Sequence, residues 1–209
     1  MTSSPLTAAD LLVALHDIDL EKNQMKTVIN ATGYCFAQPN VFTHEVLALV
    51  LQQLVERDPL PILIMRTVMQ SLSMFPTLLG YVITILNRLI QKKVWLADKR
   101  VWDGFIRTCD KTEPQSLLTL LRLEPPQLRE VFQSVPRLRT SLLNLVLSYG
   151  EADRSGISPD IMQVLTTEPE KRETSAPPEP MQQQQHPHLE HVIKIENEPG
   201  HSPSQPATE

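Results

Sequence analysis

Apolar residues recur every three to four positions along most of the chain, which is the spacing of one face of an α-helix. The first three such stretches cover residues 7–18, about Lys22 to Ala37, and Thr43 to Arg57. Thr7 can cap the first stretch, and Asp10 lies three residues later, as in a capping box. No long stretch alternates apolar and polar positions, so the sequence predicts helices and no sheet.

Prolines mark most boundaries between the predicted helices. Pro39 ends the second helix, Pro61 begins a fourth that continues to about Met74, and Pro76 begins a fifth that continues to Lys92. Proline fits the first turn of a helix, where its missing N–H removes no hydrogen bond. Further helices are expected from Asp98 to about Cys109, in three short stretches near Pro114, Pro125 and Pro136, and from Pro159 to Leu165.

Two features indicate where packing should be tightest. The fifth predicted helix is apolar on almost all sides before Asn87 and Arg88, so other helices should cover it and it should lie at the centre of the fold. Gly33 lies inside the second predicted helix, where glycine costs about 1 kcal/mol relative to alanine. A close contact between helices is therefore expected at Gly33.

The order of these helices predicts an all-α fold. Short helices joined by tight turns pack as antiparallel neighbours. Nine or ten helices packed in sequence indicate an irregular helical-repeat stack, a HEAT-like α-solenoid. Because no clean tetratricopeptide or ankyrin period is present, a compact helical bundle stays open as the alternative. This helical domain is expected to cover residues 1–165.

Composition changes sharply after the last predicted helix. Residues 166–209 contain eight prolines, a glutamine run from Gln182 to Gln185, and few large apolar side chains. Such a segment cannot bury enough apolar surface to offset an ordering entropy of about 1–2 kcal/mol per residue, which predicts a disordered tail. The tail carries 3 basic and 8 acidic residues, against 16 and 16 before it, and so accounts for the net charge of −5.

The common signatures of catalysis are absent from the sequence. There is no phosphate-binding loop, no dinucleotide fingerprint, no metalloprotease motif and no nucleophile elbow. Cys35 and Cys109 are isolated, and only His16 and His44 precede the tail, so neither a disulfide framework nor a metal site is predicted. We therefore expect a non-enzymatic protein with no catalytic residue, cofactor or metal.

The sequence also argues against insertion in a membrane. The longest apolar stretches are interrupted by polar residues and fall short of the roughly 20 residues of a membrane span. The first ten residues have neither a basic start nor a long apolar run, so no signal peptide is expected.

One segment, residues 88–111, combines seven basic residues with three acidic ones and contains both tryptophans. Trp102 has the helical spacing of a core residue, whereas Trp95 follows the fifth helix in a turn. Tryptophan and arginine are enriched at binding hot spots, which favours a protein partner. An RNA-contacting module built on the same segment is the alternative. The predicted contact residues are Lys92, Lys93, Trp95, Lys99, Arg100 and Arg107.

A modification motif lies in the predicted tail. Residues 193–196 have the sequence Ile-Lys-Ile-Glu, which fits the pattern for attachment of a small ubiquitin-like modifier. Lys194 is therefore the predicted acceptor. Patterns of four residues arise often by chance, so this prediction depends on a conjugation assay with Lys194→Arg.

Several separated blocks of the chain resemble the C-terminal region of the symplekin family, in the same order. Together they extend over roughly Pro5 to Leu165, and the tail has no such resemblance. The matching blocks begin at Pro5 (PLTAADLLVALHDID), Glu45 (EVLALVLQQL), Leu63 (LIMRTVMQSL), Val101 (VWDGFIR) and Lys111 (KTEPQS).

The resemblance implies a scaffold that acts in 3′-end formation of messenger RNA precursors, including histone transcripts. It implies docking of the endonuclease subunit of the cleavage and polyadenylation specificity factor and its inactive relative, together with the cleavage stimulation factor. It also implies a nuclear location, with a cytoplasmic pool in some members. Symplekins are far longer and carry an N-terminal HEAT-repeat region, so we expect this chain to be a fragment or a short isoform.

Overall fold

The computed structural model describes residues 6–18 and 24–167, without the side chains of residues 152 and 153. The chain divides into two compact units, Met1–Glu170 and Lys171–Glu209. All of the second unit lies outside the described residues, and with it most of the predicted tail and Lys194. The description below therefore concerns the first unit.

The first unit is helical, and no strand occurs in the ranges that the structure describes. This confirms the predicted all-α fold. The α-helices are α1 (Ala8–His16), α2 (Met25–Phe36), α3 (His44–Glu56), α4 (Ile64–Met74), α5 (Leu79–Gln91), α6 (Lys99–Lys111), α7 (Leu117–Leu120), α8 (Pro125–Ser134), α9 (Pro136–Ser148), α10 (Glu151–Arg154) and α11 (Pro159–Thr166). Two short 3₁₀ turns, η1 (Pro76–Leu78) and η2 (Val94–Leu96), flank α5.

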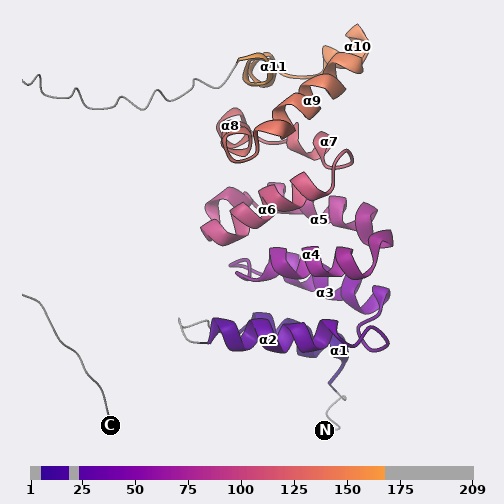
Figure 1. Cartoon of the computed structure of the whole chain (residues 1–209). Helices are drawn as coiled ribbons and strands as arrows, with labels where there is room; N and C mark the ends of the chain where they lie inside the picture. The colour runs from indigo at the N-terminus through magenta and orange to yellow at the C-terminus, as the bar shows by residue number, and fades with distance from the viewer. Residues whose placement is uncertain (1–5, 19–23, 168–209) are drawn as a thin grey trace, which may run out of the picture. The chain divides into compact units, whose positions relative to one another are not determined.

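The helices form two columns of stacked layers (Figure 1). In one column α1 packs on α3, α3 on α5, α5 on α7 and α7 on α9. In the other, α2 packs on α4 and α4 on α6. Beyond them α8 packs on α9, and α11 packs on both α8 and α9, with α8 and α11 seen end-on at the left of Figure 1. Each helix thus contacts mainly helices close to it in sequence, which is the architecture of an α-solenoid rather than of a closed bundle.

Local signals in the sequence explain where several helices begin. Thr7 Oγ1 accepts the backbone N–H of Asp10 at 3.1 Å, and Asp10 Oδ2 accepts the backbone N–H of Thr7 at 3.1 Å. The predicted capping box of α1 is therefore confirmed. At the start of α3, Thr43 Oγ1 accepts the backbone N–H of Val46 at 3.5 Å, without the reciprocal bond of a capping box, and Pro76 begins the 3₁₀ turn that leads into α5.

Other boundaries differ from the prediction. The fourth helix begins at Ile64 instead of Pro61, because the amide of Ile64 donates to the Pro61 carbonyl in a turn that precedes the helix. The single helical turn α10 was not predicted, since four residues are too few to show a helical period.

The core runs without interruption through the layers, and α5 lies in its middle. Val82, Leu86 and Leu89 are fully buried, and α5 packs against α3, α4 and α7. This confirms the central position predicted for the fifth helix. One narrow side of α5 remains exposed, along Thr84 and Arg88.

The close helix contact predicted at Gly33 is wrong. No atom lies within 4 Å of the position that a Cβ on Gly33 would occupy. The close contact is instead at Gly104, where a Cβ would lie 2.5 Å from the Cβ of Met65. Glycine is needed where α6 crosses α4, whereas the side of α2 that carries Gly33 has room for a side chain.

Candidate partner-binding surfaces

The predicted contact segment forms the corner between α5 and α6. Lys93 follows the end of α5. Its left-handed backbone, with a φ of 53°, turns the chain into η2. Lys92 precedes this turn, Trp95 lies within η2, and α6 follows with Lys99 at its start. The corner therefore brings five of the six predicted residues into one region, and Arg107 lies two turns further along α6.

Lys92 is held inside the structure. Its Nζ donates to the carbonyl oxygens of Val55, at 3.0 Å, and of Arg57, at 2.7 Å. These carbonyls lie at the C-terminal end of α3, where the last turn of a helix leaves its carbonyls without helical partners. A lysine near a helix C-terminus satisfies them and complements the helix dipole. Lys92 thus joins α5 to α3 in the packed layers.

Lys99 and Arg100 are already paired with carboxylates on their own segment. Lys99 Nζ lies 2.7 Å from Asp103 Oδ1, and Arg100 Nη2 lies 2.8 Å from Asp98 Oδ2. Side-chain hydrogen bonds from Arg100 lower the pKa of Asp98 to about 2. The two pairs are exposed and cancel charge locally, so this corner presents less positive charge than its sequence indicates.

The two tryptophans have different environments. Trp102 is only 3% exposed and stacks on Phe105, with ring centroids 5.3 Å apart and planes 15° from parallel. This confirms the prediction that Trp102 belongs to the core. Trp95 is half-buried against the core, and its neighbour Leu96 is 74% exposed. The apolar group that η2 presents most openly is therefore Leu96, which the sequence analysis did not single out.

Lys93 and Arg107 are the predicted contact residues that are both exposed and outside any ion pair with the described residues. The structure thus divides the predicted set into residues that hold the fold, residues paired with neighbouring carboxylates, and two cations without an ion pair among the described residues. The sequence could not separate them, because lysine and arginine side chains reach partners that are distant in the chain.

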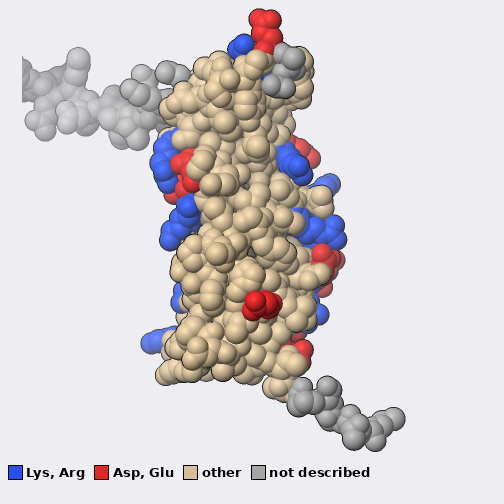
Figure 2. Space-filling view, turned by 90° about the vertical axis from the view of Figure 1, so that its right-hand side faces the viewer, with Lys and Arg blue, Asp and Glu red and all other residues tan. Residues whose placement is uncertain are grey.

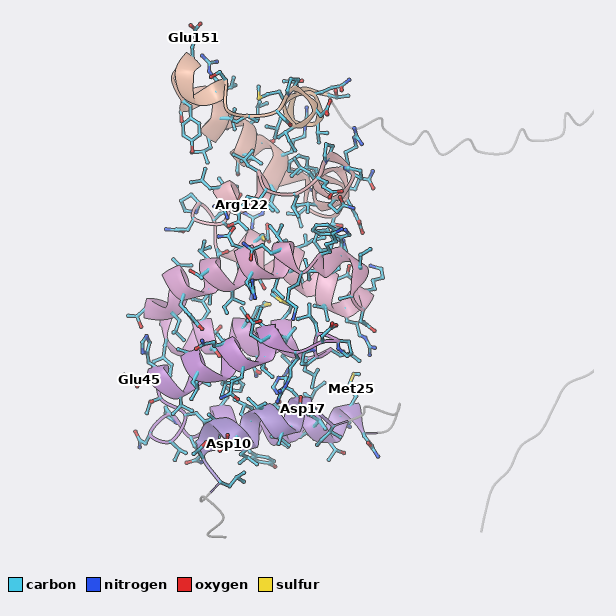
Figure 3. The ribbon with its side chains drawn as sticks, turned by 180° about the vertical axis from the view of Figure 1, so that it is seen from behind. Asp10, Asp17, Met25, Glu45, Arg122 and Glu151 are labelled. Atoms are coloured by element: carbon cyan, nitrogen blue, oxygen red, sulfur yellow. The ribbon has the colours of Figure 1, made fainter. Side chains whose placement is uncertain are left out.

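A second surface is nearly free of charge and was not predicted. We call it the uncharged edge, formed by residues 34–43 between α2 and α3 and residues 74–77 between α4 and α5. Both connections lie on the right-hand side of Figure 1. Figure 2 shows that side as mostly uncharged, with an acidic group in the middle of its lower half and the other charged groups along its margins. Glu45 is labelled at this edge in Figure 3.

The uncharged edge exposes large apolar side chains. Tyr34 is 77% exposed and Val41 is 52% exposed. The rings of His44 and Phe75 meet edge to face, with centroids 6.3 Å apart, and this contact joins the two connections. Aromatic residues are enriched, and charged residues depleted, at the centres of protein interfaces. The arrangement is therefore suited to docking another protein.

A signal for this edge was present in the sequence. No Asp, Glu, Lys or Arg occurs in residues 27–43 or in residues 67–87. Each run reads as ordinary helical core sequence, although most of its residues are only partly buried or exposed. Only the stacking of the layers brings the ends of the two runs onto one surface.

The described residues contain few of the features that catalysis requires. A small groove of about 280 Å³ lies between α3 and α5, lined by Gln52, Val55 and Tyr81, with the Glu56–Arg88 ion pair beside it. Among the residues that the structure describes, no group of three His, Cys, Asp or Glu side chains could hold a metal ion.

The two thiols are poorly suited to nucleophilic chemistry. Burial raises the pKa of Cys109, which is fully enclosed, and also that of Cys35, so both stay protonated at neutral pH. The thiolate is the reactive form of cysteine. In addition, no helix within the described ranges is long and apolar enough to cross a membrane.

These features define a class of protein, the α-solenoid-like stacks. In this class the outer surface of the stack is available to partners. The family model described as symplekin tight junction protein C terminal matches residues 1–135. Because this match covers more than half of the chain, the chain belongs to the symplekin family, and the resemblance seen in the sequence is confirmed as far as residue 135. No solved structure gave a significant match to the chain.

Proposed function

We propose that the chain is a non-catalytic scaffold for 3′-end processing of messenger RNA precursors, including histone transcripts. The family match over residues 1–135 is the observation that carries this proposal. On this proposal the partners are the endonuclease subunits of the cleavage and polyadenylation specificity factor and the cleavage stimulation factor. The chain acts in the nucleus, with a cytoplasmic pool.

The mechanism is passive and depends on a preformed surface. A stack with a continuous core loses little conformational freedom when a partner docks, so less binding energy is spent on ordering the interface. Partners that are held on one scaffold also meet at a higher effective concentration than they do free in solution. The scaffold then raises the rate of assembly without taking part in cleavage.

The uncharged edge is the surface that we propose for docking an endonuclease subunit. Tyr34 is the proposed anchor, because it is exposed, aromatic and surrounded by residues without charge. Lys93 and Trp95 at the α5–α6 corner, together with Arg107 two turns along α6, are a second proposed contact region. The pairing of Lys99 and Arg100 with carboxylates favours the uncharged edge over this corner.

The test is calorimetric titration of the full chain with each purified endonuclease subunit. Tyr34→Ala is expected to weaken binding at least tenfold, or about 1.4 kcal/mol, because it removes a central aromatic contact. Leu147→Ala is the matched control, since Leu147 is also an exposed apolar residue but lies on α9, away from the edge.

The result decides between the two surfaces. If a Lys93→Glu and Arg107→Glu double variant weakens binding and Tyr34→Ala does not, the corner is the docking site and the edge is not. If neither subunit binds the unaltered chain, the scaffold proposal itself fails.

A further inference from the structure

One column of the stack carries an exposed basic residue on each of four helices. Lys26 lies on α2, Arg66 on α4, Arg107 on α6 and Arg129 on α8. All four side chains are exposed, and none forms an ion pair with a residue that the structure describes. We call these four residues the basic ladder.

The packing places the ladder on one side of the stack. The helix α4 is covered by α3 from the other column, by α2 on one side and by α6 on the other, so its one open side faces outward. An exposed residue such as Arg66 must lie on that side. In Figure 2, basic side chains recur along both margins, and the left-hand margin corresponds to the front of Figure 1, where α2 and α6 lie.

The same surface lacks the features of a protein interface. No large apolar side chain is exposed on α4, α6 or α8 within the described residues, and the one on α2, Tyr34, lies at the opposite end of that helix from Lys26. Polar groups such as Ser73 and Gln133 lie exposed on the same helices. A surface that binds protein has an apolar or aromatic centre, whereas a surface that binds a polyanion needs positive charges with polar groups between them.

Nearby carboxylates do not cancel the ladder. Asp98 and Asp103 are occupied by Arg100 and Lys99, and Asp110 and Glu113 both contact Arg137, at 2.6 Å and 3.1 Å. Glu130, which is exposed beside Arg129 on α8, is the exposed carboxylate nearest in sequence to a ladder residue. The four ladder charges therefore act with little local compensation.

We infer that the basic ladder binds a single-stranded polynucleotide through its phosphate groups. Packed helices lie about 8–10 Å apart, and α2, α4 and α6 pack in succession, so their three rungs span roughly 16–20 Å across the layers, with Arg129 of α8 beyond them. A flexible single strand can follow such a line with successive phosphates. No aromatic platform lies on α4, α6 or α8 for bases to stack on, so the contacts are to the backbone and the binding is independent of sequence.

The test measures binding of a labelled oligouridylate to the full chain by fluorescence anisotropy over a salt series. Four phosphate contacts give a slope of log affinity against log salt of roughly −2.8 for a single strand, which is a loss of roughly 50-fold between about 50 and 200 mM salt. Arg66→Gln combined with Arg107→Gln should reduce the magnitude of the slope by about 1.4. Glu130→Gln should strengthen binding.

Arg88→Gln is the matched control, because Arg88 lies on α5 in the other column and is paired with Glu56 at 3.0 Å. It should leave both affinity and slope unchanged. A polyglutamate peptide that competes as well as the oligonucleotide at equal charge would show that the ladder binds acidic protein instead. Absence of binding, or an equal loss in the Arg88 control, would also overturn the inference. An oligodeoxyuridylate should bind as well as the ribose form.

Discussion

Gly104 shows how a single residue sets the distance between two layers. It lies where α6 crosses α4, and a Cβ at this position would come within 2.5 Å of Met65 Cβ and 3.0 Å of Met65 Cγ. The nearest atom is bonded directly to the backbone, so it cannot move aside by a change of side-chain rotamer. Any larger residue must push α6 away from α4.

Gly104→Ala is therefore expected to destabilise the protein by about 1–3 kcal/mol, which is the usual cost of overpacking a core. Gly33→Ala should stabilise it by about 0.5–1 kcal/mol, because Gly33 is helical and a Cβ there meets no other atom. Urea unfolding of both variants provides the measurement. If both substitutions change the free energy of unfolding in the same direction, the assignment of Gly104 as the close contact is contradicted.

His16 is a buried histidine whose two ring nitrogens are both occupied. Nδ1 lies 2.7 Å from the carbonyl oxygen of Leu12, and because a carbonyl only accepts, Nδ1 carries the proton. Nε2 lies 2.7 Å from Thr67 Oγ1 and accepts the proton of that hydroxyl, which joins α1 to α4. Burial lowers the pKa of His16, although the Leu12 carbonyl and Asp17 raise it in part.

The stability contributed by neutral His16 should depend on pH. A lowered pKa in the folded state means that this contribution is present above the unfolded pKa of about 6.5 and is lost as the pH falls through the folded-state pKa. The Tm of the unaltered protein should therefore fall between about pH 7 and pH 5, and His16→Gln should flatten this dependence. Exposed His44 is the control, and a His44→Gln variant that flattens the curve equally would refute the assignment.

At the scale of the elements, Lys92 decides how α5 is fixed to α3. Lys92→Met keeps most of the side-chain stem but removes both hydrogen bonds to the carbonyls of Val55 and Arg57. We expect a loss of about 1–3 kcal/mol in the free energy of unfolding, since hydrogen bonds to charged groups are the stronger ones. Denaturant titration measures the loss, and Lys93→Met, at an exposed position in the same turn, is the control.

The outcome also tests the role first assigned to Lys92. A side chain that contacts a partner can be replaced without loss of stability, whereas one that holds two helices together cannot. If Lys92→Met keeps full stability but binds an endonuclease subunit more weakly, Lys92 is a contact residue after all.

Local signals made most of the elements predictable. Thr7, Thr43 and Pro76 act on the residues beside them, so the starts of α1 and α3 and the 3₁₀ turn that leads into α5 follow directly from the sequence. The partners of charged side chains did not follow, because Lys92 reaches carbonyls 35 and 37 residues away. The glycine contact was predicted at Gly33 instead of Gly104 for the same reason, since a helix propensity contains no information about the helix opposite.

The surfaces were still harder to predict. The uncharged edge and the basic ladder both join residues from several layers, and each layer contributes only one or a few side chains to either surface. A segment such as residues 88–111 is prominent in the sequence because its charges are consecutive. Consecutive residues of one helix point to different sides of that helix. The consecutive charges of residues 88–111 therefore do not lie on one surface in space.

At the scale of the whole helical unit, the contacts run mainly between neighbouring layers. An α-solenoid of this kind has a stability that is approximately the sum of layer stabilities and interfaces between adjacent layers. Within the described residues, α5 has neighbours in the layers on both sides, whereas α11 rests mainly on α8 and α9. Opening of α11 therefore breaks fewer interfaces than opening of α5.

Amide hydrogen exchange should follow this arrangement. Amides of α5 are expected to exchange slowest, close to the rate set by global unfolding, and those of α11 distinctly faster. Leu142→Ala, a truncation of a fully buried residue on α9, should accelerate exchange in α8, α9 and α11 more than in α1 and α3. If exchange rises equally in all of these helices, the unit unfolds as one cooperative body. The columns would then describe its geometry but not its energetics.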